Sequence, residues 1–122
     1  MAAREELEKC LPLTPATFQI LLALADSESH GYGIMQEVET RSQGRVRLGL
    51  GTLYSSIKRL LNDGWLEESQ LRPDPALDDE RRRYYRLSAL GRQIAVAEAE
   101  RLANLVADAR AKKLLPALEL GA

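Results

Sequence analysis

The segment 50–61, Leu-Gly-Thr-Leu-Tyr-Ser-Ser-Ile-Lys-Arg-Leu-Leu, constrains the fold more than any other part of the 122-residue chain. Its apolar residues recur at the spacing of one helix face: Leu53, Ile57, Leu60 and Leu61. The opposite face carries hydroxyl, phenol, amide and cationic groups: Thr52, Tyr54, Ser55, Ser56, Lys58, Arg59 and Asn62. Such groups bond phosphate oxygens and base edges, and a helix fits the DNA major groove. On its own, the segment also describes an ordinary amphipathic surface helix.

The start of this helix contains Gly51 and Thr52. A glycine there lets the backbone approach a partner closely. We expect Thr52 to cap the first turn, because threonine is a good N-cap residue.

Charge is unevenly distributed along the chain, although the formal net charge is only −1. Residues 41–92 contain eleven Lys and Arg against seven Asp and Glu, a net of +4. The remaining residues carry six against eleven, a net of −5. A basic middle part between acidic ends indicates a local anion-binding surface, and chance clustering is the alternative.

Cysteine and histidine usage excludes several classes of protein. The single cysteine, Cys10, allows no internal disulfide, and one cysteine with one histidine argues against a Cys/His zinc site. The N-terminus lacks the pattern of a signal peptide, and no apolar run reaches the roughly 18 residues of a membrane span. We therefore expect a cytoplasmic protein without membrane association, metal or cofactor.

The other elements follow from caps and periodicity. Thr14 and Pro15 begin a helix, and 30–33 forms a turn into a second helix that ends near residue 42. We interpret His30 as a capping residue at that turn. Tyr32 is predicted either to stack in the core or to point its hydroxyl at a phosphate. The glycine of Asp63-Gly64 ends the 50–63 helix.

Two strands are predicted beyond this point, at 65–71 and 81–87. The loop between them is acidic at 78–80. Ser88 then caps a last helix that we expect to reach about residue 115, where Pro116 ends it.

The last helix outruns a small domain and carries a broad apolar stripe. We predict that this stripe forms a dimer interface: Leu90, Ile94, Ala97, Leu102, Leu105, Val106 and Ala109. The alternative is a helix folded back onto its own core.

The order of elements is three helices, a strand, a loop, a strand and a long helix. This order predicts a mainly α fold with a small two-stranded β-hairpin, which is a winged helix-turn-helix whose third helix enters the major groove. We assign residues 1–87 to a DNA-binding domain and 88–122 to a dimerisation helix and tail.

Four blocks of sequence resemble the PadR family of bacterial transcriptional regulators, in the family's order and spacing. They are 30–32 (His-Gly-Tyr), 51–54 (Gly-Thr-Leu-Tyr), 60–66 (Leu-Leu-Asn-Asp-Gly-Trp-Leu), and 83–88 (Arg-Tyr-Tyr-Arg-Leu-Ser) followed by Gly91-Arg92. The resemblance covers residues 13 to about 92. The single C-terminal helix is similar to that of the compact subfamily and is short compared with the C-terminal domain of the other subfamily. One departure is Ser55, which stands where the family commonly has proline.

The resemblance implies a homodimer that binds double-stranded DNA at a pseudo-palindromic operator, usually as a repressor released by a small-molecule effector. It implies DNA contact by Tyr32, Thr52, Tyr54 and the wing arginines Arg81, Arg82 and Arg83. From the helix face itself we add Ser55, Ser56, Lys58 and Arg59. Because the loop is acidic, we expect these wing arginines to pair partly with its carboxylates or with Glu67 and Glu68.

A different class of function also fits the sequence. Winged helices can act as protein–protein adaptors without binding DNA, and the near-neutral net charge and acidic loop suit that alternative. An enzyme is not expected, because no nucleophile–base pair or carboxylate cluster has a suitable context.

Overall fold

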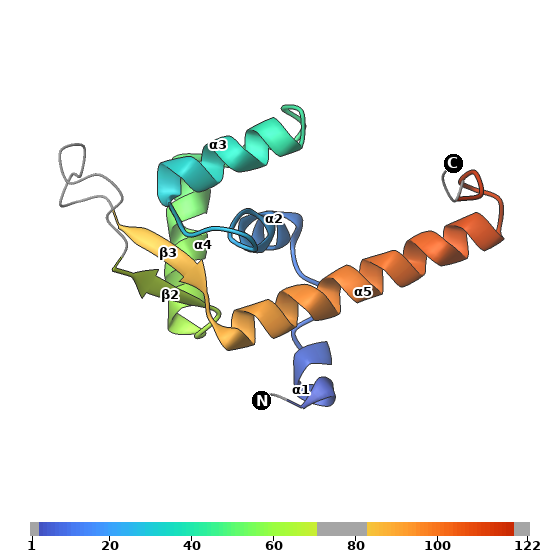
Figure 1. Cartoon of the computed structure of the whole chain (residues 1–122), viewed down its shortest axis with the longest axis horizontal. Helices are drawn as coiled ribbons and strands as arrows, with labels where there is room; N and C mark the ends of the chain where they lie inside the picture. Colours follow the sequence, from blue (N-terminus) through green and yellow to red (C-terminus); the bar gives the residue numbers. More distant parts are fainter. Residues whose placement is uncertain (1–2, 71–82, 119–122) are drawn as a thin grey trace.

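The computed structural model describes residues 3–70 and 83–118. The elements in that part of the chain are α1 (Arg4–Glu8), α2 (Pro15–Ala23), β1 (Ser29–His30), α3 (Gly31–Arg41), α4 (Leu50–Asn62), β2 (Leu66–Ser69), β3 (Tyr84–Leu87) and α5 (Ala89–Ala111). Figure 1 shows α2, α3 and α4 grouped beside the sheet, while α5 runs past them and its C-terminal half projects away. This mainly helical winged-helix arrangement confirms the predicted fold class.

The sheet has three strands in the order β1-β3-β2, all antiparallel, where two were predicted. The additional strand, β1, pairs Ser29 with Tyr85 and His30 with Tyr84. The sequence prediction missed it because two residues are too few to show the alternation of a strand. β1 therefore connects the start of α3 directly to the sheet.

The two predicted strands are present but shorter than expected, at Leu66–Ser69 and Tyr84–Leu87. We call β2, β3 and the chain between them the wing. The predicted acidic stretch 78–80 and two predicted DNA contacts, Arg81 and Arg82, lie outside the described residues.

Two predicted helix starts have the expected caps. The Thr14 hydroxyl accepts the Thr17 N–H at 3.2 Å, with Pro15 as the first residue of α2. The Ser88 hydroxyl accepts the Gly91 N–H at 2.9 Å at the start of α5. Each bond satisfies an N–H that a helix otherwise leaves without an intrahelical acceptor.

α5 ends at Ala111 rather than near residue 115 as predicted. Lys113 adopts a left-handed conformation with φ 63°. Its N–H donates to the Arg110 carbonyl at 2.9 Å, and the Leu114 N–H donates to the Ala109 carbonyl at 2.8 Å. These bonds satisfy the last carbonyls of the helix, so α5 ends before Pro116 is reached.

One hydrophobic core joins α2, α3 and α4 to the sheet and to the first half of α5. Its least exposed members are Ile20, Leu21, Ile34, Val38, Leu53, Leu60 and Ile94. The approach of α5 is close, because a Cβ added at Gly91 would lie 1.9 Å from the Trp65 carbonyl oxygen. Arg92 joins the same turn to the segment just after α2 by donating to the Ala25 carbonyl at 2.8 Å.

Within residues 3–70 and 83–118, no helix combines enough length with enough apolar character to cross a bilayer.

Candidate nucleic-acid interface

α4 separates its residues into a buried face and an exposed face. Leu53, Ile57 and Leu60 are at most 2% exposed and lie in the core. On the opposite side the predicted contact residues Thr52, Tyr54, Ser55, Lys58 and Arg59 are exposed, and Ser56 is half-buried. The structure therefore places these six predicted residues along the outer side of one helix.

The helix begins one turn earlier than a cap at Thr52 would allow, and that part of the prediction is wrong. Gly49 is the N-cap residue, and its carbonyl accepts the Leu53 N–H at 2.9 Å. Thr52 therefore lies inside the first turn with its side chain exposed. Its hydroxyl is not used as the cap, which leaves it on the outer face.

The aromatic ring of Tyr54 packs over Gly31 at the start of α3. A Cβ on Gly31 would lie 2.6 Å from the Tyr54 hydroxyl oxygen, so only glycine leaves room for the ring where it lies. Tyr54 is nevertheless 49% exposed, and Tyr32, next to Gly31, is 53% exposed. The alternative that Tyr32 stacks in the core is therefore wrong. Both tyrosines lie exposed where the start of α3 packs against α4.

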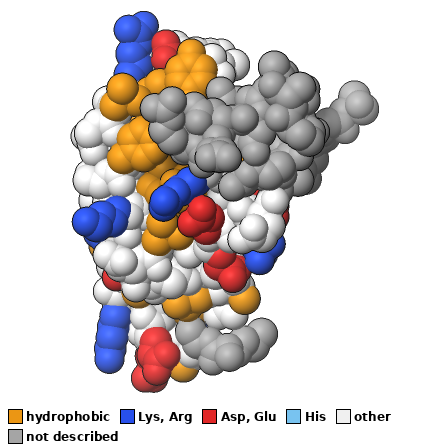
Figure 2. Space-filling model, turned by 90° about the vertical axis from the view of Figure 1, so that its left-hand side faces the viewer, with side chains coloured by type: hydrophobic (Ala, Val, Ile, Leu, Met, Phe, Trp, Pro, Cys, Tyr) orange, Lys and Arg blue, Asp and Glu red, His pale blue; other side chains and the backbone are white. Residues whose placement is uncertain are grey.

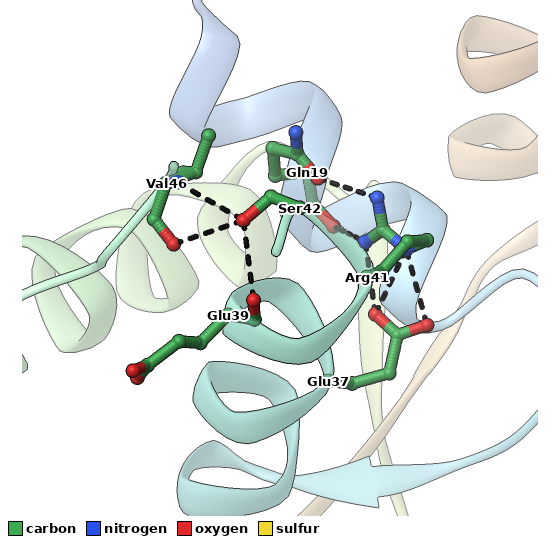
Figure 3. A network of polar contacts seen from close by, with 6 residues as sticks. All are labelled: Gln19, Glu37, Glu39, Arg41, Ser42 and Val46. Carbon is green, nitrogen blue, oxygen red and sulfur yellow. Dashed lines mark hydrogen bonds and ion pairs between the residues drawn. The ribbon is translucent and has the colours of Figure 1, made fainter. Parts of the chain in front are cut away.

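A polar network holds the other end of α3 and the turn that leads into α4 (Figure 3). Arg41 donates to the Gln19 side chain at 2.6 Å and forms an ion pair with Glu37 at 2.8 Å. The Ser42 hydroxyl accepts the Val46 N–H at 3.0 Å. The network links α3 to α2 and shapes the turn 43–49, where Arg45 and Arg47 are exposed.

The two cations of α4 have different surroundings. Lys58 is exposed on the outer face. Arg59 instead donates to the hydroxyl of Thr17 on α2 at 2.7 Å, and that threonine is only 3% exposed. Arg59 thus links α4 to α2 in this structure, a structural role that the sequence did not reveal.

The described part of the wing contains cross-strand ion pairs. Arg83 lies 3.8 Å from Glu68, as the sequence had suggested for a wing arginine. Arg86 lies between Glu67 at 3.8 Å and Glu28 at 3.6 Å. These side chains are largely exposed, so each pair contributes little to stability and can be exchanged for another anion at small cost.

His30 is the N-cap residue of α3, as interpreted from the sequence. Its Nδ1 accepts the Gly33 N–H at 3.1 Å, and its ring meets Tyr84 edge-on with centroids 5.2 Å apart. Among the described residues, no three His, Cys, Asp or Glu side chains are grouped to hold a metal ion.

The predicted dimer stripe on α5 falls into two parts. Ile94 is 1% exposed inside the protomer's own core, so its assignment to an exposed stripe is corrected. Leu90, Ala97 and Ala109 are half-buried. Leu102, Leu105 and Val106 are 36%, 52% and 39% exposed and cover no part of the core.

Glu98 is a buried residue that sequence reasoning missed. It is 1% exposed, accepts the Leu13 N–H at 2.7 Å and is hydrogen-bonded by Arg101. The hydrogen bond from Arg101 holds the pKa of the Glu98 carboxyl below its ordinary value. A glutamate on an alanine-rich helix is usually solvated, so nothing in its sequence context signals this burial.

A groove of about 680 Å³ runs between α1 and α5. Its apolar wall includes Leu7, Leu11, Pro12, Val96 and Ala97. Charged side chains of both signs also line it: Arg4, Arg92, Arg101, Glu8 and Glu100. Sequence patterns do not indicate this groove, because it depends on how α1 lies against α5.

Figure 2 shows the face at the left of Figure 1, where the wing and the start of α3 lie. Hydrophobic side chains gather there into an exposed patch, with Lys and Arg side chains on several sides of it. Asp and Glu side chains lie on the same face, so it combines apolar surface with charges of both signs.

Comparison with protein families gives a match to the model described as the transcriptional regulator PadR-like family, over residues 20–97. A comparison with curated protein sequences gives no match.

Among solved structures, a transcriptional regulator from Clostridium thermocellum is similar with a TM-score of 0.64 at 20% identity, over 92% of this chain and 97% of that chain. RosR of H. salinarum is similar with a TM-score of 0.58 at 26% identity, over 84% of this chain and 98% of that one. PadR of Bacillus subtilis, in complex with operator DNA, has a TM-score of 0.56 at 20% identity, over 67% and 46%.

Proposed function

The chain belongs to the PadR-like family of transcriptional regulators, and from this premise we propose that it binds DNA as a homodimeric repressor. Its target is a pseudo-palindromic operator, and a small-molecule effector releases it. The proposal assigns no enzymatic activity, and it places the protein in the cytoplasm, where a regulator of this kind meets its operator.

The exposed face of α4 carries the proposal. The apolar side of α4 is buried in the core, while the outer side of the helix presents hydroxyls, a phenol and a cation. These groups suit the base edges and phosphates of a major groove, which is where winged helices place this helix. A similar structure, that of Bacillus subtilis PadR, is described in complex with operator DNA.

Individual roles follow from the surroundings of each side chain. Thr52, Ser55 and Ser56 are assigned to bases or phosphates from α4, and Lys58 to a phosphate. Tyr32 and Tyr54 are assigned to phosphates of the DNA backbone, because both phenol rings are about half exposed where the start of α3 packs against α4.

Three assignments concern arginines of the wing and one an arginine of α4. Arg81 and Arg82 remain predictions for the wing. Arg83 and Arg59 must first exchange their partners Glu68 and Thr17 for DNA.

The exposed half of α5 supports the homodimer. Leu102, Leu105 and Val106 are followed by Leu114, Leu115 and Leu118, which are 40–77% exposed. Exposed apolar side chains on a projecting helix and on the segment that follows it are typical of an association surface. Residues 1–87 are thus assigned to DNA binding and 88–122 to pairing of the protomers. The first turns of α5 also pack into the core of the DNA-binding domain.

The groove between α1 and α5 supports the effector. Its volume of about 680 Å³ lies within the usual range for small-molecule sites, and it combines an apolar wall with arginines and carboxylates. Because the groove contains α5 residues on both sides of Glu98, an occupant would act on the helix that pairs the protomers.

The testing experiment is a selection of bound duplexes from a random DNA pool at two salt concentrations, with the oligomeric state measured by light scattering. We expect an inverted repeat with half-site centres about 10 base pairs apart. Recovery of unselected DNA that is lost at moderate salt would mean phosphate attraction alone and would refute the operator. In that case, a protein partner without DNA binding becomes the leading alternative.

A further inference from the structure

Leu50, the first residue of α4, is an apolar side chain that takes no part in the core formed by residues 3–70 and 83–118. It is 59% exposed, whereas Leu53 and Ile57, which face inward on the same helix, are at most 2% exposed. Leu50 is absent from the hydrophobic core and from the partly buried residues that pack against it. Its exposure on the face of α4 that carries Tyr54 calls for a partner outside the protomer.

Leu50 lies between two glycines at which the described fold leaves room for a side chain. A Cβ added at Gly49 or Gly51 would meet no atom within 4 Å in the described part of the chain. Neither glycine has a positive φ, and the φ of Gly49 is −67°. Glycine also disfavours a helix relative to alanine, so its presence at Gly51 weakens α4 with no gain in internal packing.

These two observations have one explanation in common, a surface that approaches the backbone closely around Leu50. Side chains at 49 and 51 would hold such a surface away from the helix, whereas glycines let Leu50 reach it. The major-groove edges of the four bases offer one exposed alkyl group, the 5-methyl of thymine.

We propose that Leu50 packs against the 5-methyl group of a thymine in each half-site, and that Gly49 and Gly51 provide the clearance for this contact. The inference rests on the proposed function and adds to it a residue that reads sequence. It predicts a thymine at one fixed position of the operator.

The test replaces thymines of the selected operator by uracil, one position at a time. Uracil lacks the methyl group and keeps the same hydrogen-bonding edge, so only the alkyl contact is removed. We expect the wild-type protein to bind about fourfold more weakly per half-site at one position, the loss expected for one buried methyl. Leu50→Ala should bind the thymine operator more weakly and should not distinguish thymine from uracil there.

Asn62→Ala is the matched control, because Asn62 is also exposed on α4 but lies at the opposite end of the helix from Leu50 and has no assigned DNA contact. This variant should keep the preference for thymine even where its overall affinity falls. Thermal unfolding of each variant shows whether the fold is intact, which is expected for a residue as exposed as Leu50.

Three outcomes would overturn the inference. In the first, the wild-type protein binds all uracil-substituted operators as tightly as the thymine operator. In the second, Leu50→Ala retains the full preference for thymine. In the third, the wild-type protein recovers no specific DNA, which refutes the proposed function as well and is thereby distinguished from the first two.

Discussion

Replacing Gly91 by alanine tests how closely α5 is held to the sheet. The added Cβ would lie 1.9 Å from the Trp65 carbonyl oxygen and 2.8 Å from its carbonyl carbon. Both atoms belong to the backbone, and the same oxygen accepts the Ser88 N–H at 3.0 Å. No rotamer change relieves this contact, so α5 must move away by about 1 Å or more.

We expect a loss near the upper end of the range for overpacked sites, about 3 kcal/mol. For a chain of this size that corresponds to a fall in Tm of about 12 °C. The matched control is Gly51→Ala, where nothing lies within 4 Å of the added Cβ. There the helix propensity of alanine should raise the stability by up to about 1 kcal/mol and the Tm by about 4 °C.

The assay is thermal and urea unfolding of the three proteins at one protein concentration, because dimerisation would make the Tm depend on concentration. Equal stability of Gly91→Ala and the wild type would refute the close packing of α5 on Trp65. A Gly51→Ala variant that is less stable than wild type would refute the statement that the described fold leaves room for a side chain at this position.

Other perturbations give further expected results. The folded-state pKa of Glu98 is depressed, so its stabilising contribution is present above its unfolded pKa and is lost as pH falls through the folded pKa. Glu98→Gln should therefore flatten the acid limb of a curve of unfolding free energy against pH. An unchanged acid limb would contradict this. Leu105→Glu should give a monomer by light scattering at micromolar concentration, and a persistent dimer would place the interface elsewhere. Lys58→Ala should reduce the salt slope of DNA binding by about 1 with no change in Tm. Arg59→Ala should also lower the Tm, since it loses the bond to Thr17, and equal melting of the two variants would argue against that bond.

Local signals predicted the elements of the fold well. Thr14, Ser88 and Gly64 mark helix ends by chemistry that acts within a few residues, and each acts as predicted. The exception at Thr52 arises because Gly49 can begin the helix without a side-chain cap, so a better capping residue further on was not needed.

Long-range contacts could not be predicted in the same way. The bond between Arg59 and Thr17 joins residues 42 positions apart, and the bond between Glu98 and Leu13 joins residues 85 apart. The inward position of Ile94 was missed for the same reason, since periodicity shows that a face is apolar but not which surface covers it. Whether α5 pairs with a second copy remains a prediction, as do the DNA contacts.

The close packing of Gly91 on Trp65 and the hydrogen bond from Leu13 to Glu98 fix the first half of α5 to the domain, so the rest of the helix acts as a rigid arm. Its first turns cannot slide or tilt on the domain, while residues 102–108 are exposed. In a dimer paired around Leu105, the arm from there to Gly91 is about 20 Å long. Rotating the two helices by about 10° at their crossing would displace each domain by about 3.5 Å, close to the rise of one base pair. A small change of crossing angle at such a dimer contact would thus shift the domains by about the rise of one base pair, with no rearrangement inside either domain.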